Sequence, residues 1–126
     1  MSEYELTDSM HSVISNIWAA EAIFLTVLSA YVAVAFTVGG RLSSYQCGFV
    51  NAVFVLTVLT NSLNTFTMMS QAVHIGSQLQ EYSSHYVDAN ASVFAEISTW
   101  SVYGMRTLLA IGALIFMWNV RQPKTD

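Results

Sequence analysis

Hydrophobic residues are concentrated in three long segments, which are separated by short polar stretches. Segments 18–39, 48–70 and 96–120 are each close to the roughly 20 residues that an α-helix needs to cross the hydrocarbon core of a bilayer. Aromatic side chains suited to the membrane–water interface lie near the segment ends, at Trp18, Tyr45, Trp100 and Trp118. The pattern therefore predicts an all-α integral membrane protein whose three transmembrane helices form an up-down-up bundle.

The polar stretches divide the remainder of the chain. We expect an external acidic tail over 1–17, a short cytoplasmic turn over 40–47, an external loop over 71–95 and a cytoplasmic tail over 121–126. The polar periodicity of the second helix continues beyond its predicted span. The first part of the external loop is therefore expected to extend that helix.

The turn between the first two helices carries sequence signals for helix ends. Glycine readily adopts the left-handed conformation that closes many helices, so we expect Gly39 or Gly40 to end the first helix in this way. Ser43 and Gln46 have the spacing of a capping box, in which each side chain bonds the backbone N–H of the other residue. Together these signals predict a tight antiparallel hairpin.

The distribution of basic residues predicts the orientation in the membrane, because cytoplasmic loops carry an excess of Lys and Arg. Arg41 lies in the first turn, and Arg121 and Lys124 lie in the C-terminal tail. The two segments expected outside, 1–17 and 71–95, contain neither Lys nor Arg. We therefore expect the N-terminus outside and the C-terminus in the cytoplasm, and we assign the chain to a bacterial inner membrane.

The composition supports a membrane protein and excludes some partners. Of the 126 residues, 54% are hydrophobic and only 10% are charged, whereas ordinary soluble domains carry about 25% charged residues. The formal net charge of −4 removes the usual electrostatic basis for binding nucleic acid. Cys47, the single cysteine, excludes an internal disulfide. The lipid bilayer is therefore the expected partner, and nucleic acid is not.

The third segment contains an arginine, Arg106, well inside the apolar stretch. An arginine near a helix centre costs roughly 2.5–3.5 kcal/mol on insertion scales, and each Leu, Ile, Phe or Val offsets only about 0.3–0.6 kcal/mol. Insertion is therefore marginal unless Arg106 faces protein or water. Counting about 1.5 Å per residue places Glu21 of the first helix at a depth that the Arg106 side chain reaches. We predict an intramembrane ion pair between Glu21 and Arg106.

The second helix carries a polar seam whose members recur at spacings of three and four, with Asn61 beside them. This spacing places them on one helix face. The seam consists of Thr57, Thr60, Asn61, Asn64, Thr67, Gln71 and His74. The remaining faces suit lipid and hold Phe54, Val55, Val58, Leu59, Leu63, Phe66 and Met69. The seam is interpreted first as a helix-packing surface and second as the lining of a cavity for a ligand, water or an ion.

The other two helices have faces that match this seam. The first helix has a track of small residues, which let membrane helices approach closely: Ala19, Ala22, Thr26, Ser29, Ala33 and Thr37. The third helix aligns Arg106 with small and polar neighbours: Glu96, Thr99, Tyr103, Ala110, Ala113 and Met117. We expect both faces to turn toward the seam.

The sequence contains no recognisable catalytic set, so we predict no catalytic residue, no metal, no cofactor and no enzymatic activity. It lacks a phosphate-binding loop, paired catalytic carboxylates and a nucleophile–base arrangement. His11, His74 and His85 all fall on the expected outer side, and imidazole is a common metal ligand. Their spacing matches no metal motif, and only His74 is placed to lie between helices.

These features favour a small non-enzymatic subunit that has a structural or interaction role and forms a homo-oligomer or joins a larger membrane complex. A pore or transport component lined by the second helix is the alternative, and a haem- or quinone-binding respiratory anchor is the third option. Three spans with this orientation resemble phage holins in outline, but such holins tend to have a strongly basic C-terminal tail, and here that tail has two basic residues. In length and helix number the chain also resembles respiratory membrane-anchor subunits, whose haem-ligating histidine pattern is missing here.

Overall fold

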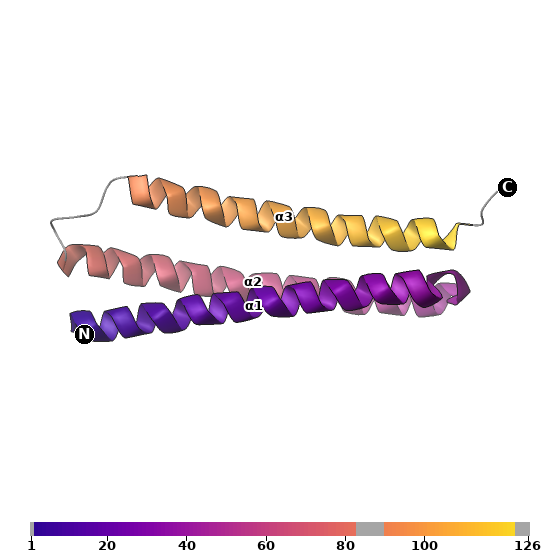
Figure 1. Cartoon of the computed structure of the whole chain (residues 1–126), viewed down its shortest axis with the longest axis horizontal. Helices are drawn as coiled ribbons and strands as arrows, with labels where there is room; N and C mark the ends of the chain where they lie inside the picture. Colours follow the sequence, from indigo (N-terminus) through magenta and orange to yellow (C-terminus); the bar gives the residue numbers. More distant parts are fainter. Residues whose placement is uncertain (1, 83–89, 123–126) are drawn as a thin grey trace.

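The computed structural model describes residues 2–82 and 90–122, apart from the side chains of 80, 82 and 90–98. This part of the chain is all-helical, as predicted, and contains no strand. The helices are α1 (Glu3–Val38), the short 3-10 helix η1 (Gly39–Arg41), α2 (Ser44–Tyr82) and α3 (Asn90–Arg121). The three long helices lie side by side, and each runs opposite to the one before it (Figure 1).

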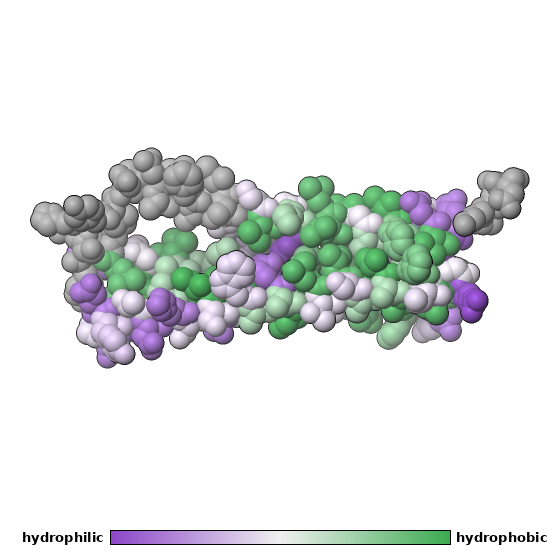
Figure 2. Space-filling model, in the orientation of Figure 1, coloured by the Kyte–Doolittle hydropathy of each residue, from purple (hydrophilic) through white to green (hydrophobic). Residues whose placement is uncertain are grey.

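All three long helices are long and apolar enough to cross a membrane. The candidate spans are Glu3–Arg41, Ser44–Leu79 and Thr99–Arg121. In Figure 2, hydrophobic residues cover much of the middle of the visible face, and hydrophilic residues gather toward its two ends. This distribution is typical of a bundle with an apolar belt between two polar regions.

The first two long helices extend beyond the predicted spans. α1 begins at Glu3, because Ser2 and Glu5 form a capping box: Ser2 Oγ accepts from the Glu5 N–H at 3.3 Å, and Glu5 accepts from the Ser2 N–H at 2.8 Å. The acidic segment expected as a tail is thus helical from residue 3. α2 continues to Tyr82, past the end of its predicted span at residue 70.

The turn between α1 and α2 confirms one sequence prediction and contradicts another. Ser43 and Gln46 form the expected capping box, with N–H to side-chain distances of 2.9 and 3.2 Å. The left-handed glycine is wrong, because Gly39 has φ −53° and ψ −42° and no glycine in the described residues has positive φ. A Cβ on Gly39 would lie 3.2 Å from Val120 Cγ1 and 3.3 Å from Met117 Sδ. The close approach of α3 therefore leaves little room for a side chain at Gly39.

The packed core lies toward the end of the bundle that holds the α1–α2 turn. α1 packs on α2 along much of its length, and α2 and α3 contact each other least. The rings of Tyr31 and Phe54 stack with centroids 4.0 Å apart. The buried core consists of Tyr31, Ala35, Cys47, Phe54, Ala113 and Met117. The prediction that Phe54 faces lipid is wrong, because α2 turns this residue toward α1.

Candidate functional site

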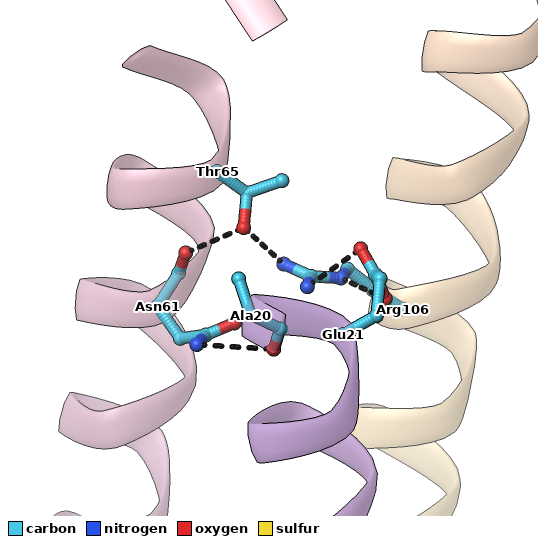
Figure 3. Close-up of polar contacts among 5 residues, drawn as sticks. All are labelled: Ala20, Glu21, Asn61, Thr65 and Arg106. Carbon is cyan, nitrogen blue, oxygen red and sulfur yellow. Dashed lines mark hydrogen bonds and ion pairs between the residues drawn. The ribbon is translucent and has the colours of Figure 1, made fainter. Parts of the chain in front are cut away.

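Arg106 of α3 and Glu21 of α1 come together between the helices (Figure 3). Arg106 Nη2 and Glu21 Oε1 approach to 2.7 Å as an ion pair without hydrogen-bond geometry. The Nε–H of Arg106 donates to Glu21 Oε2 at 3.1 Å. The arginine is 3% exposed, and the glutamate side chain is 24% exposed. The structure thus brings together the two residues that the depth argument paired.

Arg106 has two further neighbours that the sequence prediction did not include. Its Nη1–H donates to Thr65 Oγ1 of α2 at 3.3 Å, and Thr65 is fully buried. Its guanidinium carbon lies 4.9 Å from the centre of the Phe24 ring, and Phe24 is also buried. A cation over an aromatic face is attracted by the ring quadrupole. The arginine is therefore held by a charge, a hydroxyl and a ring from two other helices.

Asn61 extends this set of contacts to the backbone of α1. Its amide Nδ2–H donates to the Ala20 carbonyl at 3.3 Å. The Thr65 hydroxyl donates to the backbone carbonyl of Asn61 at 3.0 Å, so it both accepts from the arginine and donates along its own helix (Figure 3). We call Glu21, Asn61, Thr65 and Arg106 the polar junction. It connects all three long helices at one level.

The polar junction fixes how the helices align. Removing one partner of a buried ion pair leaves an uncompensated charge, which costs about 3–5 kcal/mol. A shift of α3 by one helical turn, about 5.4 Å, separates Arg106 from both Glu21 and Thr65. The register that satisfies the arginine is therefore strongly preferred. With the charge neutralised inside the chain, the junction is suited to holding the bundle together.

Most of the predicted polar seam of α2 faces outward. Thr60, Asn64, Thr67, Gln71 and His74 are exposed, whereas Thr57 and Asn61 are half-buried. The hydroxyls of the three threonines donate to backbone carbonyls four residues earlier on the same helix, at 2.8–3.1 Å. Asn61 is the one seam residue in the described chain with a hydrogen bond to another helix. The seam therefore contributes a single residue to the polar junction.

Of the two faces expected to meet the seam, the one on α1 is exposed and the one on α3 is partly buried. Every member of the small-residue track on α1, from Ala19 to Thr37, is exposed. The inward face of α1 instead carries Ala20, Phe24, Tyr31 and Ala35. The expectation for α1 is therefore wrong. The predicted face of α3 does turn inward at Arg106, Ala113 and Met117, while the side chain of Glu96 lies outside the described residues.

Sequence reasoning missed Thr65 and a second polar contact between α1 and α2. The Tyr31 hydroxyl donates to Asn51 Oδ1 at 2.7 Å. The available signal was the spacing of Cys47, Phe54, Asn61 and Thr65, which recur at sevens and fours on one face of α2. That face mixes apolar and polar residues, so its hydrophobic pattern did not stand out.

The histidines do not form a metal site in the described part of the chain. His11 and His74 are exposed, and His85 lies outside the described residues. Within that part, no group of three or more His, Cys, Asp or Glu residues is placed to hold a metal ion. His74 does not lie between helices, and it makes a 3.4 Å contact with Gln78 on its own helix.

Comparison with protein-family models, with curated proteins and with solved structures finds no significant match. Proposals about function therefore depend on the geometry of the chain itself.

Proposed function

We propose that the chain is a non-enzymatic, multi-pass membrane protein that assembles with copies of itself through the outward polar face of α2. The proposed orientation is N-terminus outside and C-terminus in the cytoplasm of a bacterial inner membrane, with the helices crossing up, down and up. The proposal is based mainly on one observation: Asn64 and Gln71 are exposed on a helix that is long and apolar enough to span a membrane.

Asn64 lies inside the predicted span 48–70 and needs a partner in a bilayer, whereas Gln71 lies one residue beyond that span. Burying an amide in an apolar medium without a hydrogen bond costs roughly 2–7 kcal/mol, depending on the reference state. In the described part of the chain, neither the Asn64 nor the Gln71 side chain has a hydrogen-bond partner. The neighbouring threonine hydroxyls bond their own backbone, so they need no partner. The demand for a second helix is therefore strongest at Asn64.

A second copy of the chain fits this demand. Each carboxamide has both donors and an acceptor, so the same residue on two copies pairs with itself across a twofold axis. The face carries no formal charge that would repel an identical face. The exposed small residues of α1, including Ala22, Ser29 and Ala33, provide a further surface on which helices approach closely.

The test measures self-association in liposomes by energy transfer between labelled copies. In the variant Asn64→Leu with Gln71→Leu, we expect roughly tenfold weaker association, because interhelical hydrogen bonds in membranes average about 0.6 kcal/mol each. Leu63→Ala is the matched control, because Leu63 is exposed beside Asn64 and apolar. Unchanged association of the double variant, or a monomeric wild-type protein, contradicts the proposal.

A pore is the second candidate, and the same face supports it. In a ring of copies with this face inward, threonine hydroxyls and amides line the central path and water supplies their hydrogen bonds. Ion flux from the same liposomes distinguishes the two cases. Association without flux supports a packing interface. Flux that Asn64→Leu abolishes supports a pore.

A further inference from the structure

Two exposed arginines lie at the end of the bundle that holds the α1–α2 turn. Arg41 ends η1, and Arg121 is the last residue of α3. The turn and the end of α3 touch: a Cβ on Gly39 would lie 3.2 Å from Val120 Cγ1, and one on Gly40 would lie 3.6 Å from the Val120 carbonyl oxygen. Each arginine directly follows one of these contacting residues, so both lie at one corner of the bundle (Figure 1). We call Arg41 and Arg121 the basic corner.

The basic corner has no acidic partner in the described part of the chain. The ion pair found there joins Glu21 to Arg106, and Arg121 donates only to a neutral group, from Nη2 to Ser44 Oγ at 3.4 Å. The remaining described acids lie toward the opposite end of the bundle: Glu3, Glu5, Asp8 and Glu81. An anion is therefore the chemical complement of this corner.

The surroundings of the basic corner suit an anion that is attached to apolar chains. Arg41 and Arg121 end two candidate membrane spans, Glu3–Arg41 and Thr99–Arg121. Val38 and Trp118 lie three residues before them, about one helical turn further into the spans, and they are 39% and 69% exposed. An acyl chain therefore has an apolar surface directly beside a phosphate group held at this corner. A free phosphate ion would use the charges but not that surface.

Arginine is well suited to a phosphate group, because its planar guanidinium donates two parallel hydrogen bonds to phosphate oxygens. Basic pockets between membrane helices on the cytoplasmic side bind anionic lipid headgroups, and this end of the chain is the one proposed to be cytoplasmic. We propose that Arg41 and Arg121 together bind the phosphate of one anionic phospholipid, whose acyl chains lie along Val38 and Trp118. The contact with Ser44 holds the Arg121 side chain beside the start of α2.

This lipid site rests on the proposed insertion in a membrane, and it is independent of self-association because it shares no residue with Asn64 or Gln71. Trp118 supplies the reporter. In the full-length variant Trp18→Phe with Trp100→Phe, Trp118 is the only tryptophan left. Bromine atoms on lipid acyl chains quench a tryptophan that they contact, so brominated lipids report which lipid lies beside Trp118.

The experiment compares brominated phosphatidylglycerol, which is anionic, with brominated phosphatidylcholine, which has no net charge, in mixed vesicles at physiological ionic strength. We expect both lipids to quench Trp118 and phosphatidylglycerol to quench it more strongly at equal mole fraction. A chain quenched by neither lipid is not inserted, which contradicts the membrane proposal as well. A chain quenched equally by both is inserted, and this result overturns the lipid site alone.

Variants of the basic corner test the two arginines. Arg41→Gln and Arg121→Gln should each weaken the preference for phosphatidylglycerol roughly tenfold, as for the loss of one hydrogen bond to a charged group. Arg121→Gln with Asn119→Arg is the matched control, because it restores the net charge but moves it about 200° around α3, to an exposed position. The preference should stay as low as in Arg121→Gln alone. Full recovery shows diffuse attraction to the anionic surface and overturns the site.

Sodium phosphate distinguishes a lipid headgroup from a soluble anion. Added at an ionic strength matched by sodium chloride, it should leave the preference for phosphatidylglycerol no weaker than the chloride control does, because it gains nothing from the apolar surface at Val38 and Trp118. If phosphate abolishes the preference and chloride does not, the basic corner binds a soluble phosphate and the lipid assignment is wrong.

Discussion

Two hydrogen-bonding faces of α2 lie within a few residues of each other, but one faces the other helices and the other faces outward. Asn61 and Thr65 face α1 and α3 and contact Glu21, Arg106 or the α1 backbone. Thr60, Asn64, Thr67 and Gln71 face away from both helices. Both surfaces are hydrogen-bonding, but only the first adjoins a formal charge. The face of α2 that adjoins the charge of Arg106 is the one that packs inside the chain.

The largest expected effect comes from the ion pair. Arg106→Leu leaves the Glu21 carboxylate and the Thr65 hydroxyl without their partner. We expect a loss of about 3–5 kcal/mol in the free energy of unfolding, the range for breaking a buried pair. Unfolding by sodium dodecyl sulfate in mixed micelles, followed by circular dichroism, measures it.

The charge reversal Glu21→Arg with Arg106→Glu tests whether the pairing itself matters. The reversed pair should recover part of the stability and of the membrane insertion lost in either single reversal. If the double variant behaves no better than the single ones, the pair does not stabilise the bundle.

A smaller effect is expected for Thr65, and Thr67 offers a matched control. Thr65→Val keeps the shape and removes the acceptor of Arg106 Nη1. We expect a loss of about 1.5 kcal/mol, where the ranges for hydrogen bonds to charged groups and for hydrogen bonds in membrane bundles overlap. Thr67→Val removes an exposed hydroxyl bonded to its own helix and should change stability by less than about 0.5 kcal/mol. Equal effects in the same unfolding assay would remove the distinction between the two faces.

The smallest effect on the fold is expected for Asn61, and Asn64 serves as its matched comparison. Asn61→Leu removes the hydrogen bond to the Ala20 carbonyl and should lower the unfolding free energy by about 0.6 kcal/mol. Asn64→Leu should leave the unfolding free energy of the single chain unchanged, because its amide contacts no other helix. It should instead weaken self-association in liposomes. If Asn64→Leu instead lowers the unfolding free energy of the single chain, the polar seam of α2 lies inside the bundle.

Several features could be predicted because they depend on local spacing. Three apolar segments of membrane-spanning length follow from counting residues, and the Ser43–Gln46 capping box follows from a separation of three. The contact between Glu21 and Arg106 follows from a constant rise per residue, which places an acid and a base at similar depths on two antiparallel helices. None of these inferences requires knowing which face of a helix turns inward.

The inward faces of α1 and α2 were decided only by the tertiary structure. In water the apolar face turns inward, but lipid is as apolar as the core, so periodicity alone does not distinguish the two sides of a membrane helix. Stacking of Tyr31 on Phe54 and the partners of Arg106 select one face, and the small track of α1 and the amides of α2 remain outside. Gly39 follows the same rule, since its role comes from the distance to α3 and not from its own conformation. The sequence by itself determined the number and order of the membrane-length helices and the level of their charges, and packing determined their rotation.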